Sequence, residues 1–574
     1  MSTVAAQDAT MYWLSSRTRN DLFMLYCFND SGRSGAELRE FVARRSADIA
    51  DLSVRLRALP ADLDYPAWVR CEFRAEQFVE HFLPEPNWPG VCTVLGKLLG
   101  TGVDAAVRPW RLHVFRGVDG APGGAGPATV VVLQMSHALA DGRRGAEIAR
   151  ALFTEVGEGA AVASGELIAR GGVAVREGPV AAERAVAQDG STALDEQFVT
   201  SEGVDGAAPV GSAASIVDAA PVVALRDSVA LAEEFAMSRQ VAGTAPIAGA
   251  AFGPARVAAL QDSVARALGG QVASIGRRLG AAVVEAAPVD PIHVHSGLAL
   301  LRMPIQFART VIRGYEAFRA QQELAESTRA GRIPGPGPGF TPSLVNRTDS
   351  TARPAHQVRM IVCDAERMRI PGHTVTVVAL TAVSIALDRY LTARDARMDR
   401  LGAQVPMALS DNRIAARNNY RSLGIDLFID EPDLPVRVNK IAAALADRRT
   451  RARHPLLTAQ DRVTAVTPAP LLRRDIERYP LDTVPDSIAG HTVVSSVYRG
   501  PADLTFGGAP VRFTGGFPAI GSVMHLTHGV HGLGDTVTVS IHADADALPD
   551  IDTYANLLRD ALNEVFDCAT GELR

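Results

Sequence analysis

Apolar, β-branched runs predict strands in the first 153 residues of the chain. LHVFRGV at 112–118 and TVVVLQM at 129–135 are two such runs. After the second run the pattern changes to helical spacing, because the apolar positions recur at intervals of three and four residues. These positions are Ala146, Ala149, Leu152 and Phe153. The stretch Val130–Phe153 therefore predicts a strand, a turn and a helix.

The C-terminal part, from about residue 345, also alternates between strand-like and helix-like segments. Strands are predicted at QVRMIVCD, VPMALS, LGIDLFI, HTVVSSVY and TVTVSIHAD, and helices at LPVRVNKIAAALADRRTRA and DIDTYANLLRDALNEVF. The longest uncharged apolar stretch is Ile370–Leu387, which contains four Thr or Ser residues. We expect it to form a buried core helix rather than a membrane span, and we expect no transmembrane segment.

The middle of the chain differs in composition. Residues 154–252 are rich in Ala and Gly, and this insertion is expected to be partly disordered or peripheral because it offers few large apolar groups to bury. Residues 253–344 combine a helical crossover with a Pro/Gly linker, GRIPGPGPGFTPS at 331–343. The sequence therefore predicts an α/β protein with an N-terminal subdomain at 1–153 and a C-terminal subdomain at 345–574.

Composition narrows the classes of function. The 574 residues carry a net charge of −6, which gives no indication of nucleic-acid binding. Five cysteines are scattered without a CxxC pair, which argues against a zinc ribbon and favours a reduced, cytoplasmic setting. The N-terminus lacks a basic start followed by an apolar core, so we expect no signal peptide.

The histidines outside the first subdomain do not predict a metal site. His525, His528 and His531 lie in an extended segment, where residues three apart face opposite sides. His293 and His295 would share one face of a strand, but no third ligand is evident. We therefore expect no bound metal.

The turn predicted between strand and helix contains the most informative residues, His137–Gly142, which read HALADG. A histidine at a strand end can point into a cavity and act as a general base, because its ordinary pKa is about 6.5. Asp141 could hold the loop by pairing with an arginine, and Gly142 permits a tight turn before the helix. A plain strand–turn–helix connection with a solvent-facing histidine would explain the same residues, and both interpretations stay open.

The pattern HxxxDG, together with further segments, resembles the bacterial wax ester synthase/diacylglycerol acyltransferase (WS/DGAT) family. This family belongs to the chloramphenicol-acetyltransferase-like superfamily, which includes nonribosomal condensation domains. In the family motif HHxxxDG the second histidine is catalytic; it corresponds to His137, and Ser136 stands at the first position. The other segments that resemble the family are Gln7–Met11, Arg108–Leu112, Pro406–Ser410, Asn418–Asn419 and Val493–Pro501.

Five positions depart from the family pattern. The family has an Asn-Asp pair in one helix, an Arg at the end of one strand, and an Asn and a Pro near its tunnel. The residues found instead are Thr376 and Val377, Ser410, and Ser496 and Tyr498. Because these changes remove polar anchors or alter the tunnel wall, they leave open which substrates the chain uses and whether it keeps full activity.

The resemblance implies two chloramphenicol-acetyltransferase-like subdomains, each a mixed β-sheet with flanking helices, and an active-site tunnel at their interface. It implies transfer of a fatty acyl group from acyl-CoA to a lipid alcohol or diacylglycerol hydroxyl, with His137 as the general base and without an acyl-enzyme or a cofactor. Asp141 is assigned a structural role, with an arginine partner among Arg413, Arg417 and Arg421. The candidate oxyanion and substrate-binding residues are Ser136, Gly142, Ser495 and Ser496.

Two alternatives to this function stay open. The acyl donor could be bound to a carrier protein instead of CoA, or the chain could be a degenerate relative that binds lipid or scaffolds an assembly. Leu298–Gln322 adds a question about location, because it combines large apolar residues with arginines. That composition suits either a lipid surface or a helix packed on the protein itself. We expect a cytoplasmic protein, with peripheral association with the inner membrane or lipid droplets as a hypothesis.

Overall fold

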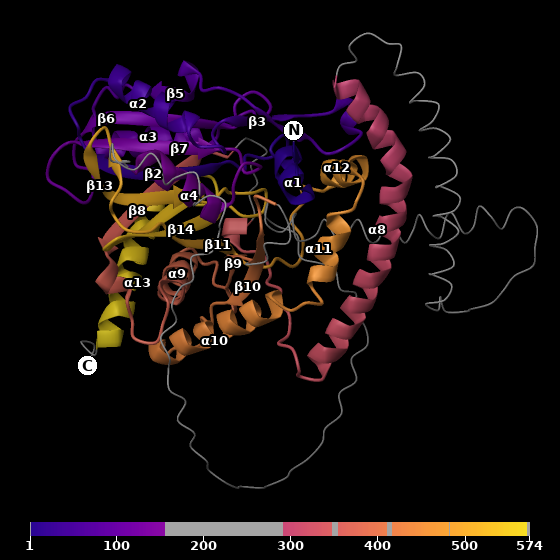
Figure 1. The fold of residues 1–574 in the computed structure, drawn as a ribbon. Coiled ribbons are helices and arrows are strands. Elements are labelled where there is room, and N and C mark those ends of the chain that lie inside the picture. The colour runs from indigo at the N-terminus through magenta and orange to yellow at the C-terminus, as the bar shows by residue number, and fades with distance from the viewer. Residues whose placement is uncertain (1, 155–290, 347–353, 410–415, 482, 571–574) are drawn as a thin grey trace, which may run out of the picture. The chain divides into compact units, whose positions relative to one another are not determined.

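The computed structural model describes residues 2–154, 291–346, 354–409, 416–481 and 483–570 (Figure 1). Apart from Thr154, these residues lie in one compact unit. Nearly all of the predicted insertion at 154–252, and the first part of the predicted crossover, lie outside the described residues.

The first sheet has six strands in the order β12-β13-β2-β7-β6-β5. It is mixed, because β5 and β6 are parallel while the other pairs are antiparallel. All eight residues of β7 are buried, which explains why its sequence is almost continuously apolar. The strands are β2 (Leu22–Asn29), β5 (Phe78–Glu80), β6 (Trp110–Val118), β7 (Ala128–Met135), β12 (Thr505–Phe506) and β13 (Ala509–Phe517).

The second sheet also has six strands, in the order β10-β9-β11-β14-β15-β8. Strand β11 runs parallel to β9 and β14, and the remaining pairs are antiparallel. The strands are β8 (His356–Asp364), β9 (Gly402–Ala408), β10 (Tyr420–Asp426), β11 (Thr492–Tyr498), β14 (Leu526–Leu533) and β15 (Thr536–Asp544). The predicted α/β class with two mixed sheets and flanking helices is thus confirmed.

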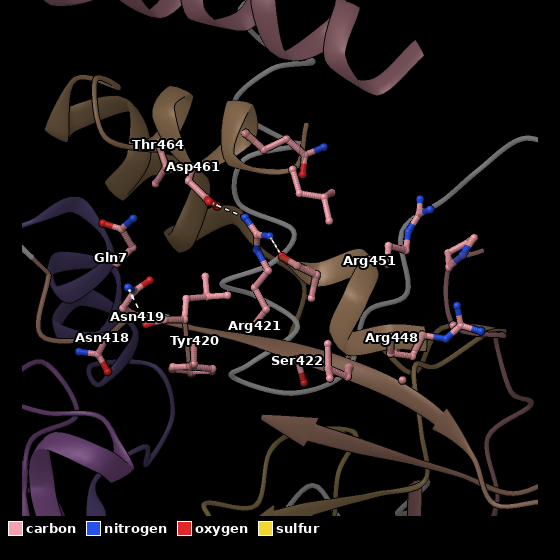
Figure 2. A pocket seen from close by; sticks show the side chains of 18 of the residues that line it. Gln7, Asn418, Asn419, Tyr420, Arg421, Ser422, Arg448, Arg451, Asp461 and Thr464 are labelled. Carbon is pink, nitrogen blue, oxygen red and sulfur yellow. Dashed lines mark hydrogen bonds and ion pairs between the residues drawn. The ribbon is translucent and has the colours of Figure 1, made fainter. Parts of the chain in front are cut away.

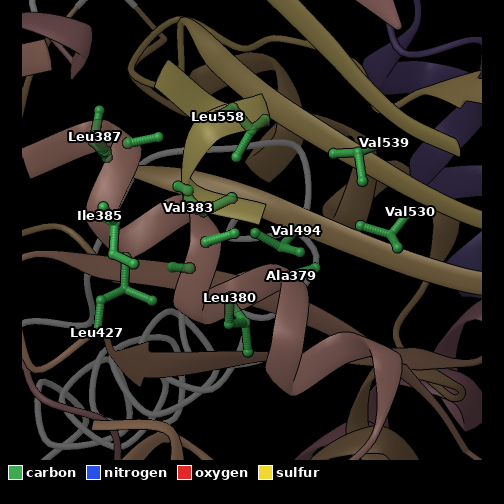
Figure 3. Packing of buried hydrophobic residues seen from close by; sticks show 14 of the residues in the cluster. Ala379, Leu380, Val383, Ile385, Leu387, Leu427, Val494, Val530, Val539 and Leu558 are labelled. Carbon is green, nitrogen blue, oxygen red and sulfur yellow. The ribbon is translucent and has the colours of Figure 1, made fainter. Parts of the chain in front are cut away.

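Helix α9 (Val375–Thr392) fills the core beside the second sheet, where α10 (Leu434–Ala452) and α13 (Ile551–Thr570) pack against it (Figure 3). Among the described residues it is the one helix long and apolar enough to cross a membrane, and 78% of it is buried inside the protein. The predicted core helix is therefore confirmed, but it begins later than Ile370. Thr374 caps it by accepting a hydrogen bond from Val377 N, and Gly372 before the cap has a φ of +81°.

The two sheets are joined by a strand from the C-terminal half. Strand β13 pairs with β2 in the first sheet and also contacts β14 and β15 of the second. The backbones approach so closely here that a Cβ on Gly529 would lie 2.2 Å from Gly516 O, so only glycine fits. A boundary at residue 345 therefore does not separate the strands of the two sheets.

Helix α8 (Pro291–Arg329) is the longest of the described helices and packs against α11 (Thr458–Thr464). Residues 331–343 contain no helix and only one isolated bridge, between Phe340 and Ile488. A small sheet in the order β1-β4-β3 completes the N-terminal part. The remaining helices and strands are α1 (Ala6–Leu14), α2 (Gly35–Ala47), α3 (Trp88–Leu99), α4 (Gly142–Phe153), α12 (Ala469–Arg478), β1 (Ser2–Thr3), β3 (Val54–Arg57) and β4 (Ala67–Arg70).

Candidate active site

The turn that carries His137 is held in place by the core. It follows β7 directly and leads into α4, as the sequence predicts. Ala138, Leu139 and Ala140 are fully buried, and Leu139 N donates to Ser136 O over 2.9 Å. With its neighbours buried, His137 stays half-buried, so its ring remains open to a ligand on one side.

His137 is hydrogen-bonded to Asn418, a residue 281 positions further along the chain. The distance from His137 Nδ1 to Asn418 Oδ1 is 2.7 Å. The amide nitrogen of Asn418 donates to His137 O at 2.7 Å and to Asp8 Oδ1 at 3.0 Å. Because both partners of that nitrogen are acceptors, the oxygen of the amide must face the imidazole.

Asp8 anchors the segment that carries Asn418. Its carboxylate accepts hydrogen bonds from Arg417 N and Asn418 N, over 2.8 to 3.0 Å, in addition to the amide of Asn418. Asp8 is 1% exposed, and this burial raises its pKa to about 6 despite these hydrogen bonds. Helix α1 therefore presents a buried acidic group that fixes the backbone beside His137.

This arrangement decides the tautomer of His137. An amide oxygen only accepts, so His137 Nδ1 must carry the proton and Nε2 keeps its lone pair. Burial lowers the pKa of His137, although the hydrogen bond to Asn418 and the charge of Asp141 oppose this. The imidazole is therefore neutral at pH 7, and a free Nε2 can accept a proton.

The carboxylate of Asp141 caps the start of α4. Its Oδ1 accepts from Arg144 N at 2.9 Å, which is N-capping geometry, and its Oδ2 accepts from Asn419 N at 3.4 Å. Asp141 N in turn donates to Arg417 O at 3.3 Å. The carboxylate thus ties the motif to the segment that carries Asn418.

The expected arginine partners of Asp141 bind elsewhere. Arg417 pairs with Asp51 at 2.5 Å, and its guanidinium carbon lies 4.4 Å from the centre of the Trp68 ring. Arg421 pairs with Asp461 at 2.5 Å, and Arg413 lies outside the described residues. Arg417 and Arg421 are therefore engaged by other carboxylates, and an arginine partner for Asp141 stays a prediction for Arg413.

The serine candidates differ in their surroundings. Ser136 is fully buried and accepts a hydrogen bond from Ala138 N at 3.4 Å, a contact internal to the turn. Ser495 and Ser496 are half-buried on β11. Alternate residues of a strand share a face, so Ser495 lies on the face of Val497, and Ser496 lies on the face of Val494, which packs in the α9 core.

Strand β11 approaches the motif at Gly142. A Cβ on Gly142 would lie 3.5 Å from the side chain of Val497. Further along α4, Arg150 donates to Arg499 O and Pro501 O and pairs with Asp503. The end of β11 therefore follows the axis of α4, and Ser495 is the serine on the face that Val497 presents to the motif.

A cavity of about 270 Å³ lies beside Asn418 (Figure 2). It is lined by Gln7 and Thr10 of α1, by residues 418–424 and by the C-terminal end of α10. Its wall includes Arg421, Arg448 and Arg451. Asn418 belongs both to this wall and to the hydrogen bond with His137, so the cavity adjoins the candidate base.

Residues 417–565 match the family model described as the WS/DGAT C-terminal domain. These residues form a WS/DGAT C-terminal domain. The resemblance stated from the sequence is thereby confirmed, and the family is one of acyltransferases. The WS/DGAT C-terminal domain begins at Arg417 and so contains Asn418, whereas Asp8 and His137 lie before it. No curated protein sequence matches the chain.

A solved structure of low sequence identity shares the fold. The chain is similar to the wax ester synthase/diacylglycerol acyltransferase from Marinobacter aquaeolei VT8, with 14% identity over 99% of this chain and 100% of that chain, and a TM-score of 0.51. The starter condensation domain of rhizomide synthetase, a double mutant in complex with C8-CoA and Leu-SNAC, has 12% identity over 99% and 94% of the two chains, and a TM-score of 0.46.

Inside the WS/DGAT C-terminal domain, the histidines on β14 and His525, which directly precedes β14, form contacts within the core. His528 bonds to Thr492 and to Tyr554 on α13, while His525 faces Asp544 at 3.3 Å. The two side chains diverge, as alternation along an extended segment requires. Among the described residues no group of three or more His, Cys, Asp or Glu side chains is placed to hold a metal ion.

The positions that depart from the family pattern also have definite places. Thr376 and Val377 are buried in α9, and Tyr498, at the end of β11, is 69% exposed. Ser410 lies outside the described residues. Sequence reasoning did not assign roles to Asp8 and Asn418, although both fall in segments that resemble the family. The one charged residue in the helix AQDATMYWL, Asp8, was the available signal.

Proposed function

We propose that the protein is an O-acyltransferase that moves a fatty acyl group from acyl-CoA to the hydroxyl of a lipid alcohol or diacylglycerol. Three features support this proposal: the WS/DGAT C-terminal domain, the position of His137 between β7 and α4, and the residues that orient its ring. The donor, the acceptor and the role of His137 are the parts that experiments must establish.

In this reaction His137 Nε2 removes the hydroxyl proton as the hydroxyl oxygen forms a bond to the acyl carbon. The tetrahedral intermediate then collapses, the carbon–sulfur bond breaks, and the thiolate takes the proton back from the imidazolium. The products are an ester and a free thiol. A positioned base contributes about 10²–10⁴-fold to such a step, and fixing both substrates in one geometry contributes further.

The observation that carries the proposal is the hydrogen-bonded series Asp8–Asn418–His137. A histidine that only linked a strand to a helix would need no fixed tautomer. Here a buried carboxylate and a buried amide hold Nδ1 protonated and leave Nε2 as the base. In this role Asp8 and Asn418 are positioning residues.

The oxyanion that develops on the thioester carbonyl needs a donor. We assign this role to Ser495 or to a backbone N–H beside it, because Ser495 lies on the face of β11 that approaches Gly142. Ser136 and Ser496 are less suited, since the first is buried within the turn and the second shares a face with the α9 core.

The test is a turnover screen by mass spectrometry. Purified protein is given acyl-CoAs of several chain lengths with long-chain alcohols or diacylglycerol, and ester and free CoA are measured together. Equal amounts of both products in the parent, and neither in His137→Ala, are expected. Turnover that occurs only with a carrier-bound acyl donor would show that the carrier protein, rather than CoA, is the donor. Binding of lipid without formation of any ester would favour the degenerate, non-enzymatic alternative.

We also propose that the protein associates with a lipid surface through α8. One side of this helix is buried at Thr310, Ala317 and Leu324. The apolar residues Ile305, Phe307, Tyr315 and Phe318 are 36%, 38%, 40% and 46% exposed. Exposed arginines flank them at positions 302, 309 and 319, a combination that suits an anionic lipid headgroup layer.

A further inference from the structure

The cavity beside Asn418 contains more positive than negative charge. Arg421, Arg448 and Arg451 line it, and Asp461 is the one acidic residue in its wall. Asp461 already pairs with Arg421, whose guanidinium also donates to Ala452 O. Arg448 and Arg451 therefore line the cavity with no carboxylate in its wall other than Asp461, which is paired with Arg421. We call this cavity the arginine pocket.

Arg448 is the arginine with unused hydrogen-bonding capacity. Its Nη1 is buried and has no hydrogen-bond acceptor among the described residues. Arg451, by contrast, donates to Thr328 Oγ1 and to Pro334 O, both at 2.8 Å. Burial and the charge of Arg448 lower the pKa of Arg451. A buried guanidinium beside a second one is costly unless an anion binds between or beside them.

The position of Arg448 is not explained by the end of its helix alone. Basic residues near a helix C-terminus interact favourably with the helix dipole, and α10 ends with several arginines. Arg453, the residue that caps α10, is exposed and does not line the pocket. Arg448 lines the pocket and keeps a buried Nη1 without an acceptor, so an anion in the pocket could accept its hydrogen bonds.

The pocket extends from Asn418, the residue bonded to His137, to the arginines; His137 itself is not part of its lining. Its lining runs from Asn418, which is bonded to His137, along β10 to Gly424. Six residues of extended chain span about 20 Å. Figure 2 shows Asn418 and Gln7 at one end, Arg421 in the middle, and Arg448 and Arg451 towards the other end. An extended pantetheine arm, which links a thioester sulfur to a phosphate, has a comparable length.

We propose that the arginine pocket binds the phosphate of the phosphopantetheine arm of the acyl donor, with Arg448 as the main contact. This inference rests on the proposed function, because it requires a thioester donor that reacts near His137. The same phosphate occurs in CoA and in a carrier protein's prosthetic group, so the pocket suits either source. Guanidinium–phosphate hydrogen bonds are charge-assisted and paired, which favours Arg over Lys at such a site.

The first experiment measures binding by calorimetry, with CoA, 4′-phosphopantetheine and pantetheine as probes. Arg448→Gln is expected to weaken the binding of CoA and of phosphopantetheine by about tenfold or more, since a hydrogen bond to a charged group is lost. Pantetheine, which has no phosphate, should bind parent and variant alike. Arg453→Gln on the same helix end is the matched control and should match the parent for all three probes.

Two further readouts keep the result interpretable. Arg448→Gln should melt at or above the parent temperature, because it removes a buried unpaired group. In the parent alone, raising the salt concentration should weaken the binding of phosphopantetheine but not the binding of pantetheine. The proposal is wrong if phosphopantetheine binds the parent and Arg448→Gln with equal affinity, or if its affinity for the parent does not depend on the salt concentration.

Turnover separates this inference from the proposed function and identifies the donor. Arg448→Gln should raise the KM for acyl-CoA, or for an acyl carrier protein if that is the donor used, and leave kcat unchanged. A parent that transfers acyl groups with a KM unaffected by Arg448→Gln would overturn the pocket assignment and leave the acyltransferase intact. Phosphate-dependent binding without any transfer would support the pocket and contradict the proposed function.

Discussion

At the scale of single residues, His137 depends on partners that are far away in the sequence. Asn418 lies 281 positions further along the chain, and Asp8 lies on helix α1. Both nevertheless determine which imidazole nitrogen is free. An amide is a suitable link because it accepts from Nδ1 and donates to the carboxylate at the same time. The result is a neutral base whose protonation state does not rely on a contacting charge.

Replacing the base should abolish catalysis and leave the fold. His137→Ala is expected to lower kcat by about 10²–10⁴-fold, the contribution of general base catalysis. Its melting temperature should change little, because His137 is only half-buried. Ester formation by mass spectrometry and thermal melting on the same sample check this. Unchanged turnover in a folded variant would exclude His137 as the base.

Removing the positioning amide should move the pH profile as well as the rate. The hydrogen bond to Asn418 raises the pKa of His137 against the larger, opposite effect of burial. Asn418→Ala should therefore lower that pKa further, so the acidic limb of kcat/KM shifts to lower pH. We also expect kcat to fall about tenfold, because both tautomers become populated.

A purely structural role for Asn418 would lower activity without moving this limb. Thr10→Ala serves as a matched control, because Thr10 lines the same cavity but bonds to Ala6 O within its own helix. An unshifted acidic limb in Asn418→Ala would show that the amide does not tune His137.

The sequence was sufficient to predict where the candidate base lies but not its environment. HxxxDG after a β-branched run places His137 at a strand end by local pattern alone. The roles of Asp8 and Asn418 arise from tertiary contacts over 410 positions, which no periodicity encodes. The same limit applies to Asp141, whose carboxylate accepts hydrogen bonds from Arg144 N and Asn419 N, contacts that the spacing of charged residues does not reveal.

At the scale of secondary structure, Asp141 caps α4 and so couples the helix to the motif. Asp141→Ala should reduce the free energy of unfolding by about 1–2 kcal/mol, the usual cost of losing an N-cap. Asp141→Asn keeps a capping oxygen and should lose less. Urea unfolding of both variants measures this order. Equal losses would mean that the charge, rather than the cap, stabilises the helix.

The first sheet contains a buried acid with a testable effect on stability. Asp21 accepts from Val103 N and from Gln134, both at 2.8 Å, and Gln134 continues to His113 at 2.9 Å. Burial raises the pKa of Asp21 to about 6 from 3.8. The folded state therefore favours the protonated acid, and the contribution of Asp21 to stability falls as the pH rises from about 4 to about 6.

Asp21→Asn should accordingly become more stable relative to the parent as the pH rises from about 4 to 7. The shift corresponds to about 3 kcal/mol at most. The hydrogen bonds survive if the new amide oxygen takes the place of Asp21 Oδ2, because Val103 N and Gln134 Nε2 both donate to that one atom. Asp48→Asn, at an exposed position, controls for the loss of one negative charge. A constant difference across this pH range would contradict a raised pKa at Asp21.

Element types followed from the sequence more reliably than their limits and partners. The runs at 112–118 and 129–135 are β6 and β7, and LPVRVNKIAAALADRRTRA is α10. Hydrophobic periodicity explains these matches, because a buried face must recur with the period of its element. It does not show that β12 and β13 leave the C-terminal half to complete the first sheet, since pairing partners depend on topology.

At the scale of the whole molecule, the two segments that resemble the family supply different parts of one site. Residues before 154 contribute His137, Asp141 and Asp8, and the WS/DGAT C-terminal domain contributes Asn418 and the arginines of the arginine pocket. The site therefore forms only when both segments are folded together. Substrates that meet at such a site must reach it from solvent or from a lipid phase. The exposed face of α8 is relevant to which of these two routes they take.

The lipid-surface proposal for α8 predicts flotation with anionic vesicles. Arg309 and Arg319 are exposed on this helix, whereas Arg313 is paired with Glu316 at 2.6 Å and is the weaker candidate. Each basic residue near an anionic surface contributes about 1 kcal/mol. Arg309→Glu with Arg319→Glu should thus reduce partitioning on the order of 30-fold or more, and high salt should release the parent.

A control with the same charge change distinguishes a local contact from general attraction. Arg39→Glu with Arg44→Glu alters two exposed arginines on α2 and should leave flotation within about twofold of the parent, since α2 has no comparable set of exposed apolar side chains. Phe318→Ser, which removes apolar area without changing charge, should weaken binding at high and low salt alike. If the α8 and α2 variants float equally well, α8 is not the membrane contact, whatever the affinity of the parent for lipid.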